Sequence, residues 1–388
     1  MLLSIALVLL FGLIFGEIFG KLRLPRVTGM IAAGIILGAL GWLNSSLLAI
    51  SADLRKIALI IILTRAGLNL ELSDLKKVGR PAILLCFVPA ALEMAGTVLL
   101  APPLLGLSYS EAAVLGAVLA AVSPAVIVPK MLALMEQGRG TDKSIPQMIL
   151  AGASVDDVFV IVMFSVFAGI EQGGEVSVMS FVNIPLSIIL GVCAGVVCGL
   201  LLSLLFKKIH LRDSYKVIIV MSAAFLLTAL ETALSGYIGF SGLIAVMAAG
   251  MTCRLRLPEA SKRVSAKFAK LWTGAEIMLF VLVGAAVDIT NALNAGIAVI
   301  ALIFAALVFR CAGVLLCLIR TRLNVKERLF CAAAYTPKAT VQAAIGGTPL
   351  AMGLACGQTV LSAAVIAILV TATLGSILID LLSKRCLY

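Results

Sequence analysis

Long apolar stretches, separated by short polar or glycine- and proline-containing breaks, run through the whole chain. Thirteen of them are long enough to form helices across a bilayer. The connections are short, so no separate soluble domain is expected. The pattern predicts an all-α fold with thirteen transmembrane helices, which we place at 1–20, 25–41, 54–70, 79–102, 110–134, 145–169, 181–206, 214–233, 237–253, 265–287, 292–319, 326–350 and 357–382.

Composition supports a membrane protein with many spans. Hydrophobic residues make up 62% of the chain and charged residues only 13%, whereas soluble domains are near 45–50% apolar and about 25% charged. The apolar run 1–20 lacks a basic start and a small-residue cleavage pattern, so it is interpreted as a retained first span. The nine cysteines show no CxxC spacing, so they predict neither disulfides nor zinc, and no cofactor is expected.

The net charge of +11 is explained by topology. Most of the 30 Lys and Arg residues lie after the first, third, fifth, seventh, ninth and eleventh spans or in the C-terminal tail. The alternate connections contain only Arg55 and Lys56. Basic residues mark the cytoplasmic side, so the N-terminus is predicted outside and the C-terminus inside a plasma or inner membrane. A nucleic-acid partner is therefore not expected.

Two adjacent acids, Asp156 and Asp157, interrupt the apolar run 145–169. A charged side chain at membrane depth costs at least about 2.5–3.5 kcal/mol, so such a pair needs counter-charges or a bound cation. The carboxylates also need access to water, because groups sealed in hydrocarbon would stay protonated. The pair predicts a site for a metal ion or a proton. The alternative, a helix end in a loop, is disfavoured because polar loops flank the run on both sides.

Three other charges lie deep in predicted spans and are candidates to meet these acids: Glu93, Arg310 and Lys338. Together the five groups sum to −1, which one Na⁺, Li⁺ or proton would neutralise. Neighbouring helical residues point about 100° apart, so one aspartate binds the ion while Lys338 or a polar backbone holds the other. Glu93 and Arg310 are expected to form a structural ion pair.

Two pairs of short segments match at the same offset of 213 residues. Thr28–Ala32 is similar to Ser241–Ala245, and Ala120-Ala-Val-Ser-Pro124 is similar to Ala333-Ala-Tyr-Thr-Pro337. Equivalent spans are seven apart, an odd number, so the two copies face opposite ways. The pattern is typical of the inverted-topology repeats of secondary transporters.

The matched prolines predict broken helices. Proline cannot donate a backbone hydrogen bond, so Pro124 frees the carbonyl of Ala120 and Pro337 that of Ala333. Non-helical backbone at membrane depth survives only where protein or water satisfies it. Two such breaks predict discontinuous helices that cross near the midplane, where freed carbonyls hold a cation; simple kinks are the alternative. Two further prolines are expected to break the same spans again: Pro129 and Pro349.

These features resemble the cation/proton antiporter superfamily over nearly the whole chain. The most specific segment, Thr336-Pro-Lys-Ala-Thr-Val-Gln-Ala-Ala-Ile-Gly346, is similar to the two-aspartate sodium/proton antiporters, in the branch that also occurs in animals. The resemblance implies exchange of Na⁺ or Li⁺ for H⁺ by alternating access. It makes Asp157 the principal ion ligand and Asp156 its neighbour, places the ion-binding Ser123 and Thr336 at the crossing, and makes Lys338 a counter-charge.

The resemblance also implies a homodimer of two-domain protomers embedded in lipid. A mobile core moves against a dimerisation domain, and one linker helix joins them. The implied division is 1–70 and 214–287 for the dimerisation domain, 79–169 and 292–382 for the core, and 181–206 for the linker.

One residue departs from the family pattern. Many two-aspartate relatives carry a lysine in the span where this chain has Arg310. Arginine keeps its proton under ordinary conditions, so this side chain cannot supply a transported proton. The expected exchange is therefore one-for-one and electroneutral, with both ions competing for the aspartates.

Other functions are compatible with buried acids. An intramembrane aspartyl protease needs carboxylates facing each other from separate helices, which adjacent residues cannot easily provide. A sodium-coupled symporter for an organic anion would use the same site for co-transported Na⁺. A K⁺/H⁺ antiporter would differ only in the cation, and a channel or sensor would lack coupling.

Overall fold

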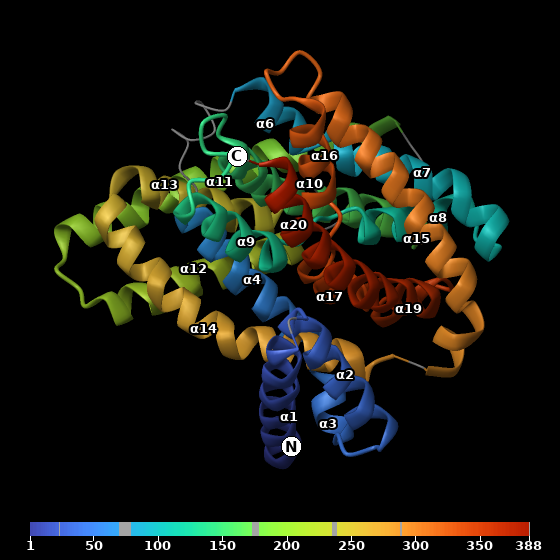
Figure 1. Cartoon of the computed structure of the whole chain (residues 1–388). Coiled ribbons are helices and arrows are strands. Elements are labelled where there is room, and N and C mark those ends of the chain that lie inside the picture. Colours follow the sequence, from blue (N-terminus) through green and yellow to red (C-terminus); the bar gives the residue numbers. More distant parts are fainter. Residues whose placement is uncertain (23, 70–78, 173–177, 235–238, 288, 388) are drawn as a thin grey trace. The chain divides into compact units, whose positions relative to one another are not determined.

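The computed structural model describes residues 1–22, 24–69, 79–172, 178–234, 239–287 and 289–387 (Figure 1). These residues form helices and no strands. In chain order the helices are α1 (Leu2–Lys21), α2 (Arg26–Ala39), α3 (Ser45–Ala49), α4 (Ser51–Asn69), α6 (Arg80–Leu85), α7 (Val88–Leu105), α8 (Tyr109–Leu119), α9 (Pro124–Glu136), α10 (Ile145–Glu171), α11 (Val178–Lys208), α12 (Asp213–Leu234), α13 (Gly242–Arg256), α14 (Pro258–Ala285), α15 (Ile289–Cys317), α16 (Val325–Ala334), α17 (Thr340–Ile345), α18 (Thr348–Ala351), α19 (Gly357–Ala367), a π-helical turn (Ile368–Ala372) and α20 (Thr373–Cys386).

The predicted all-helical fold is confirmed, and each of the thirteen predicted spans contains one or more of these helices. Among the described residues, nine helices or runs of consecutive helices are long and apolar enough to cross a membrane. The count of thirteen crossings and the inverted repeat remain predictions. Leu70, the last residue of the predicted span 54–70, lies outside the described residues.

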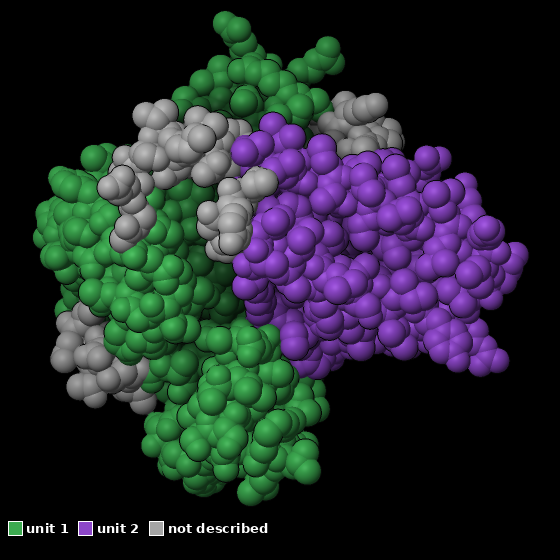
Figure 2. Space-filling model, turned by 180° about the vertical axis from the view of Figure 1, so that it is seen from behind, with its two compact units in different colours: residues 1–55, 74–173, 277–388 green, residues 56–73, 174–276 purple. Residues whose placement is uncertain are grey.

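The chain divides into two compact units (Figure 2). Unit 1 comprises residues 1–55, 74–173 and 277–388, and unit 2 comprises residues 56–73 and 174–276. Unit 1 thus combines α1 and α2 with all the helices predicted to form the core. The division into core, linker and dimerisation domain concerns movement rather than compactness, and it stays a prediction.

Unit 2 is built on a close contact between α11 and α13, with α12 against α13. Three glycines spaced four residues apart on α11 permit this contact: Gly191, Gly195 and Gly199. A Cβ at Gly191 would lie 2.6 Å from the carbonyl oxygen of Ser241, and one at Gly199 would lie 2.6 Å from that of Ala249. Small residues at this spacing let membrane helices approach backbone to backbone.

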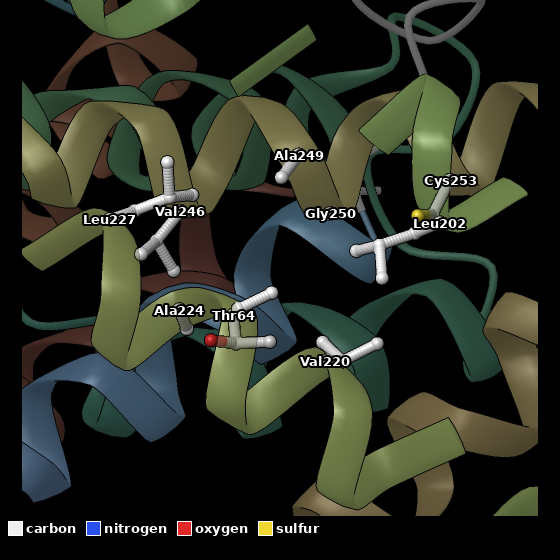
Figure 3. Close-up of a pocket in the computed structure, with 10 residues that line it drawn as sticks. Thr64, Leu202, Val220, Ala224, Leu227, Val246, Ala249, Gly250 and Cys253 are labelled. Carbon is white, nitrogen blue, oxygen red and sulfur yellow. The ribbon is translucent and has the colours of Figure 1, made fainter. Parts of the chain in front are cut away.

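A small hollow in unit 2 has about 10 Å³ of space, room for about one water molecule (Figure 3). Its lining is mostly aliphatic, with the side chains of Thr64 and Cys253 as the polar exceptions. The Thr64 hydroxyl already donates to the Ile60 carbonyl at 2.7 Å. The hollow contains no charged residue and is not a candidate ion site.

Two helices of unit 1 are interrupted at the matched prolines. The first half, α8, ends at Leu119, and α9 begins at Pro124. In the second copy, α16 ends at Ala334, and α17 begins only at Thr340. Both first halves start with a capping box, in which side-chain and backbone groups satisfy each other's hydrogen bonds; the residue pairs are Ser108 with Glu111 and Asn324 with Glu327.

The prediction that Pro129 breaks its span again is wrong, because α9 continues through it to Glu136. Proline at this position removes only the bond to the carbonyl of Ala125, in the first turn of the helix. Buried side chains on the same helix, including Ile127 and Met131, anchor α9 on both sides of the proline. Pro349 does follow an interruption, since α17 ends at Ile345 and α18 starts at Thr348.

Candidate cation site

The two interrupted helices cross at their breaks. The backbone N–H of Ser123 donates to the carbonyl of Pro337 at 2.8 Å. The hydroxyls of Ser123 and Thr340 lie 3.1 Å apart, and the Thr340 N–H also points to the Ser123 oxygen at 3.4 Å. Backbone groups that each break leaves without a helical partner are thus partly satisfied by the other break.

Asp156, on α10, is held by the first break. Its side chain is fully buried. One carboxylate oxygen, Oδ2, accepts the backbone N–H of Val122 at 2.8 Å and Nη2 of Arg310 at 2.8 Å. The sequence left open whether Lys338 or a polar backbone would hold one aspartate; in the structure the backbone does so, together with Arg310.

Arg310 extends this contact into a chain of charges. Its Nη1 lies 2.8 Å from Oε2 of Glu93, so the ion pair expected from the sequence forms. The other oxygen of Glu93, Oε1, lies 2.6 Å from Nζ of Lys338. Lys338 is therefore a counter-charge to Glu93 and has no ion pair with an aspartate in the described residues. The chain Lys338–Glu93–Arg310–Asp156 contains two acids and two bases, so its formal charge is zero.

The two carbonyls predicted to be freed have different partners: that of Ala333 accepts the Thr336 hydroxyl, whereas that of Ala120 faces a cation of the protein. The carbonyl of Ala120 accepts Nη1 of Arg310, and that of Leu119 accepts Nζ of Lys338 at 2.5 Å. The carbonyl of Tyr335, at the second break, accepts Nε of Arg310 at 2.6 Å. Both half-helix C-termini, where the dipole is negative, thus face fixed positive side chains. That freed carbonyls also contact the transported ion stays a prediction.

Asp157 is the acid that this network leaves out. It is 5% exposed, and Oδ1 has no hydrogen-bond partner. Among the described residues the Asp157 carboxylate has no ion pair, in contrast to its neighbour. The net charge of −1 that the sequence predicted for the five groups therefore resides on Asp157. A monovalent cation or a proton would neutralise it.

The two hydroxyl residues predicted as ligands differ in position. Ser123 is fully buried at the crossing, beside Thr340. The Thr336 hydroxyl donates to the carbonyl of Ala333 at 2.8 Å, within its own break. Each hydroxyl oxygen keeps lone pairs that can accept or coordinate, so neither position excludes the predicted role.

Sequence reasoning missed two polar residues that complete the crossing, Thr371 and Gln342. The Thr371 hydroxyl, in the π-helical turn, accepts the backbone N–H of Lys338 at 3.0 Å. Gln342 donates from Nε2 to the carbonyls of Ala121 and Leu119. A signal was present, since both residues are polar and lie inside apolar spans. Such side chains need partners in a membrane.

The Tyr335 ring packs against Arg310, and its hydroxyl lies beside Gly152 on α10. The Arg310 guanidinium carbon lies 5.6 Å from the centre of the Tyr335 ring, a cation–π geometry. Gly152, one turn before Asp156, gives the Tyr335 hydroxyl its space. A Cβ at Gly152 would overlap that hydroxyl and would also lie 2.9 Å from Cβ of Leu85.

We expect Gly152→Ala to destabilise the protein by about 1–3 kcal/mol, because overpacking a core forces backbone shifts. Tyr335→Phe removes the overlapping atom, and the hydroxyl has no partner among the described residues, so its loss costs little. Thermal unfolding of the purified protein measures both effects. The double variant should recover part of the loss, because the close contact with Cβ of Leu85 remains. An equal loss in the single and double variants would contradict the steric explanation.

Comparisons with known proteins agree with this arrangement. The family model described as "Sodium/hydrogen exchanger, transmembrane" matches residues 5–385. The chain belongs to the sodium/hydrogen exchanger family. This exchanger is 34% identical to mouse sodium/hydrogen exchanger 9B2, over 97% of its own length and 71% of that protein's. It is 30% identical to human sodium/hydrogen exchanger 9B1, over 94% of its own length and 73% of that protein's.

The exchanger's fold also matches solved structures. The sodium proton antiporter MjNhaP1 from Methanocaldococcus jannaschii at pH 8 superposes with a TM-score of 0.84, covering 98% of this chain and 97% of that one at 21% identity. An electron-microscopy map of the same antiporter gives a TM-score of 0.76 at 23% identity. The predicted membership of the cation/proton antiporters, in the branch found in animals, is confirmed. The exchanger is a multi-pass membrane protein.

Proposed function

We propose that this chain exchanges Na⁺, or Li⁺, for H⁺ by alternating access, and that the two ions compete for Asp157. The observation that carries the proposal is the balanced chain Lys338–Glu93–Arg310–Asp156 beside an acid with no counter-charge among the described residues. Either a metal ion or a proton neutralises that acid. An empty site keeps a buried charge that resists crossing the membrane. Competition of this kind is sufficient for antiport.

The names of the relatives, sodium/hydrogen exchangers 9B2 and 9B1, support the choice of ions. They do not favour the organic-anion symporter or the K⁺/H⁺ antiporter. A test uses vesicles that contain the protein and a pH dye. Sodium added outside acid-loaded vesicles should raise the internal pH, and lithium should do the same. Failure of both cations, or a response that requires an organic anion, would contradict the proposal.

The proposed stoichiometry is one cation for one proton. Arg310 keeps its proton, and Lys338 is tied to Glu93 and to a backbone carbonyl. Asp157 is then the group that alternates between proton and cation. Exchange should neither create nor respond to a membrane potential. A potential-sensitive dye in the same vesicles checks this, and a potential generated by sodium-driven proton movement would contradict one-for-one exchange.

The proposed assembly is a homodimer in a plasma or inner membrane, with the N-terminus outside and the C-terminus cytoplasmic. Support comes from the basic residues that follow alternate spans. In this proposal the core helices within 79–169 and 292–382 carry the ion past the dimerisation helices. Cysteine labelling from either side of the membrane would test the orientation.

A further inference from the structure

Gln342 is a fully buried polar residue at the crossing of the two interrupted helices, and the proposed exchange gives it no role. It lies in the first turn of α17. Its Nε2 donates to the carbonyl of Ala121 at 2.9 Å and to that of Leu119 at 3.3 Å. The Leu119 carbonyl is at the end of α8 and the Ala121 carbonyl is in the break before α9, so this amide joins the two interrupted helices.

These two bonds fix which way the amide faces. The amide nitrogen has two N–H donors, and the two backbone carbonyls can only accept. A flipped amide would place its oxygen against two carbonyl oxygens and lose both bonds. Oε1 of Gln342 is therefore held on the side away from Leu119 and Ala121, as an acceptor with a set direction.

That oxygen is buried and has no hydrogen-bond partner among the described residues. Two aspartate oxygens share this condition, Oδ1 of Asp156 and Oδ1 of Asp157. Gln342 and Asp156 are linked through adjacent backbone groups. Ala121, which holds the Gln342 amide, precedes Val122, whose N–H is bound by Asp156. The helices α17 and α10 that carry them are also in contact.

Three buried acceptors without donors, carried by two helices that contact each other, indicate a ligand that supplies positive charge. Buried acceptors are normally paired because leaving them bare is costly. Protein oxygens in this state can replace the hydration shell of a small monovalent cation. From this geometry, and resting on the proposed exchange, we infer that Oε1 of Gln342 coordinates the dehydrated Na⁺ or Li⁺ together with Asp157. Gln342 is thus a specificity-determining residue.

The chemistry of an amide gives this ligand one consequence that a carboxylate lacks. The neutral oxygen coordinates a metal ion but does not take up a proton at physiological pH. It stabilises the metal-bound state of the site without stabilising the protonated state. Gln342 therefore shifts the competition at Asp157 towards the metal ion, and its removal should weaken cation binding more than proton binding.

The test compares Gln342→Leu with the intact protein in vesicles containing a pH dye. We expect the half-saturating Na⁺ concentration to rise about tenfold, equivalent to about 1.4 kcal/mol, while the maximal rate changes less than twofold. Stabilisation of the purified protein against heat by Na⁺ should weaken in parallel. A structural brace alone would lower the maximal rate or the basal unfolding temperature and leave the half-saturating concentration unchanged. That result would overturn the inference.

A matched control is Gln147→Leu, the same substitution on α10. Oε1 of Gln147 also has no partner among the described residues. Gln147 is the third residue of α10, more than two turns before Asp156, and makes none of the contacts described between the two interrupted helices. Gln147→Leu should leave the half-saturating Na⁺ concentration unchanged. An equal rise in both variants would overturn the inference.

A second variant is available if Gln342→Leu does not fold. Gln342→Asn retracts the amide oxygen and should change the ratio of Na⁺ to Li⁺ affinity, and an unchanged ratio would overturn the inference. If the intact protein exchanges no cation, the proposed function fails instead.

Discussion

Asp157→Asn is expected to abolish cation-driven proton movement while leaving the protein at least as stable as before. The carboxylate is 5% exposed and has no ion pair among the described residues. Replacing it with an amide removes a buried, uncompensated charge, and with it the group that both ions share. Vesicles with a pH dye should show no response to Na⁺ or Li⁺. Thermal unfolding of the purified variant should occur at or above the wild-type temperature.

The neighbouring acid provides the contrast. Asp156→Asn removes a charge that is paired with Arg310 and bonded to the Val122 N–H. It should therefore lower the unfolding temperature, because a buried base loses a partner. Asp142→Asn, in the exposed loop before α10, is a control that should change neither property. Intact exchange in Asp157→Asn, or equal destabilisation of both aspartate variants, would argue against Asp157 as the unpaired charge.

The sequence is most informative where it places costly groups in apolar surroundings. Two adjacent aspartates in a long hydrophobic run require compensation, so their presence alone predicts a site. The offset between the repeats places Glu93 and Arg310 in equivalent spans, and these two form the ion pair. Prolines in apolar spans are informative in the same way, because the structure must accommodate a missing backbone donor. The helices are interrupted before Pro124 and around Pro337.

The same reasoning could not determine which base meets which acid. Lys338 lies between Ala334 and Thr340, where the backbone is not helical. Hydrophobic periodicity says nothing about the direction of a side chain in such a segment. Its Nζ reaches Glu93 and the Leu119 carbonyl rather than an aspartate. The path of the backbone through the break decides this, and that path depends on contacts with the other interrupted helix.

Pro129 shows where a local rule predicts a break that tertiary packing prevents. A local rule predicted a break there, yet α9 is continuous. The rule describes the loss of one hydrogen bond and one steric clash, which are small beside the packing of a whole buried helix. Packing of this kind depends on helices far apart in the sequence, so it cannot be deduced from the residues around the proline.

Glu93→Gln is expected to lower the free energy of unfolding by about 3–5 kcal/mol. Glu93 is fully buried and pairs with Arg310 through one oxygen and with Lys338 through the other. The variant leaves two buried bases facing only Asp156 in the chain of ion pairs. The unfolding temperature in detergent measures the effect. The molecules that stay folded should keep the wild-type preference between Na⁺ and Li⁺, because Asp157 is unchanged.

A second substitution separates charge balance from packing. Lys338→Met in the Glu93→Gln background removes the excess positive charge and leaves Arg310 with Asp156. If the loss comes from an uncompensated charge, the double variant should be more stable than Glu93→Gln alone, so that the two changes are strongly non-additive. If Glu93 served only to fill space, the two losses would add. Charge balance is also what makes Asp157 selective for a single positive charge: with the other four groups neutral together, one proton or one metal ion completes the site, and a second has no acid left to bind.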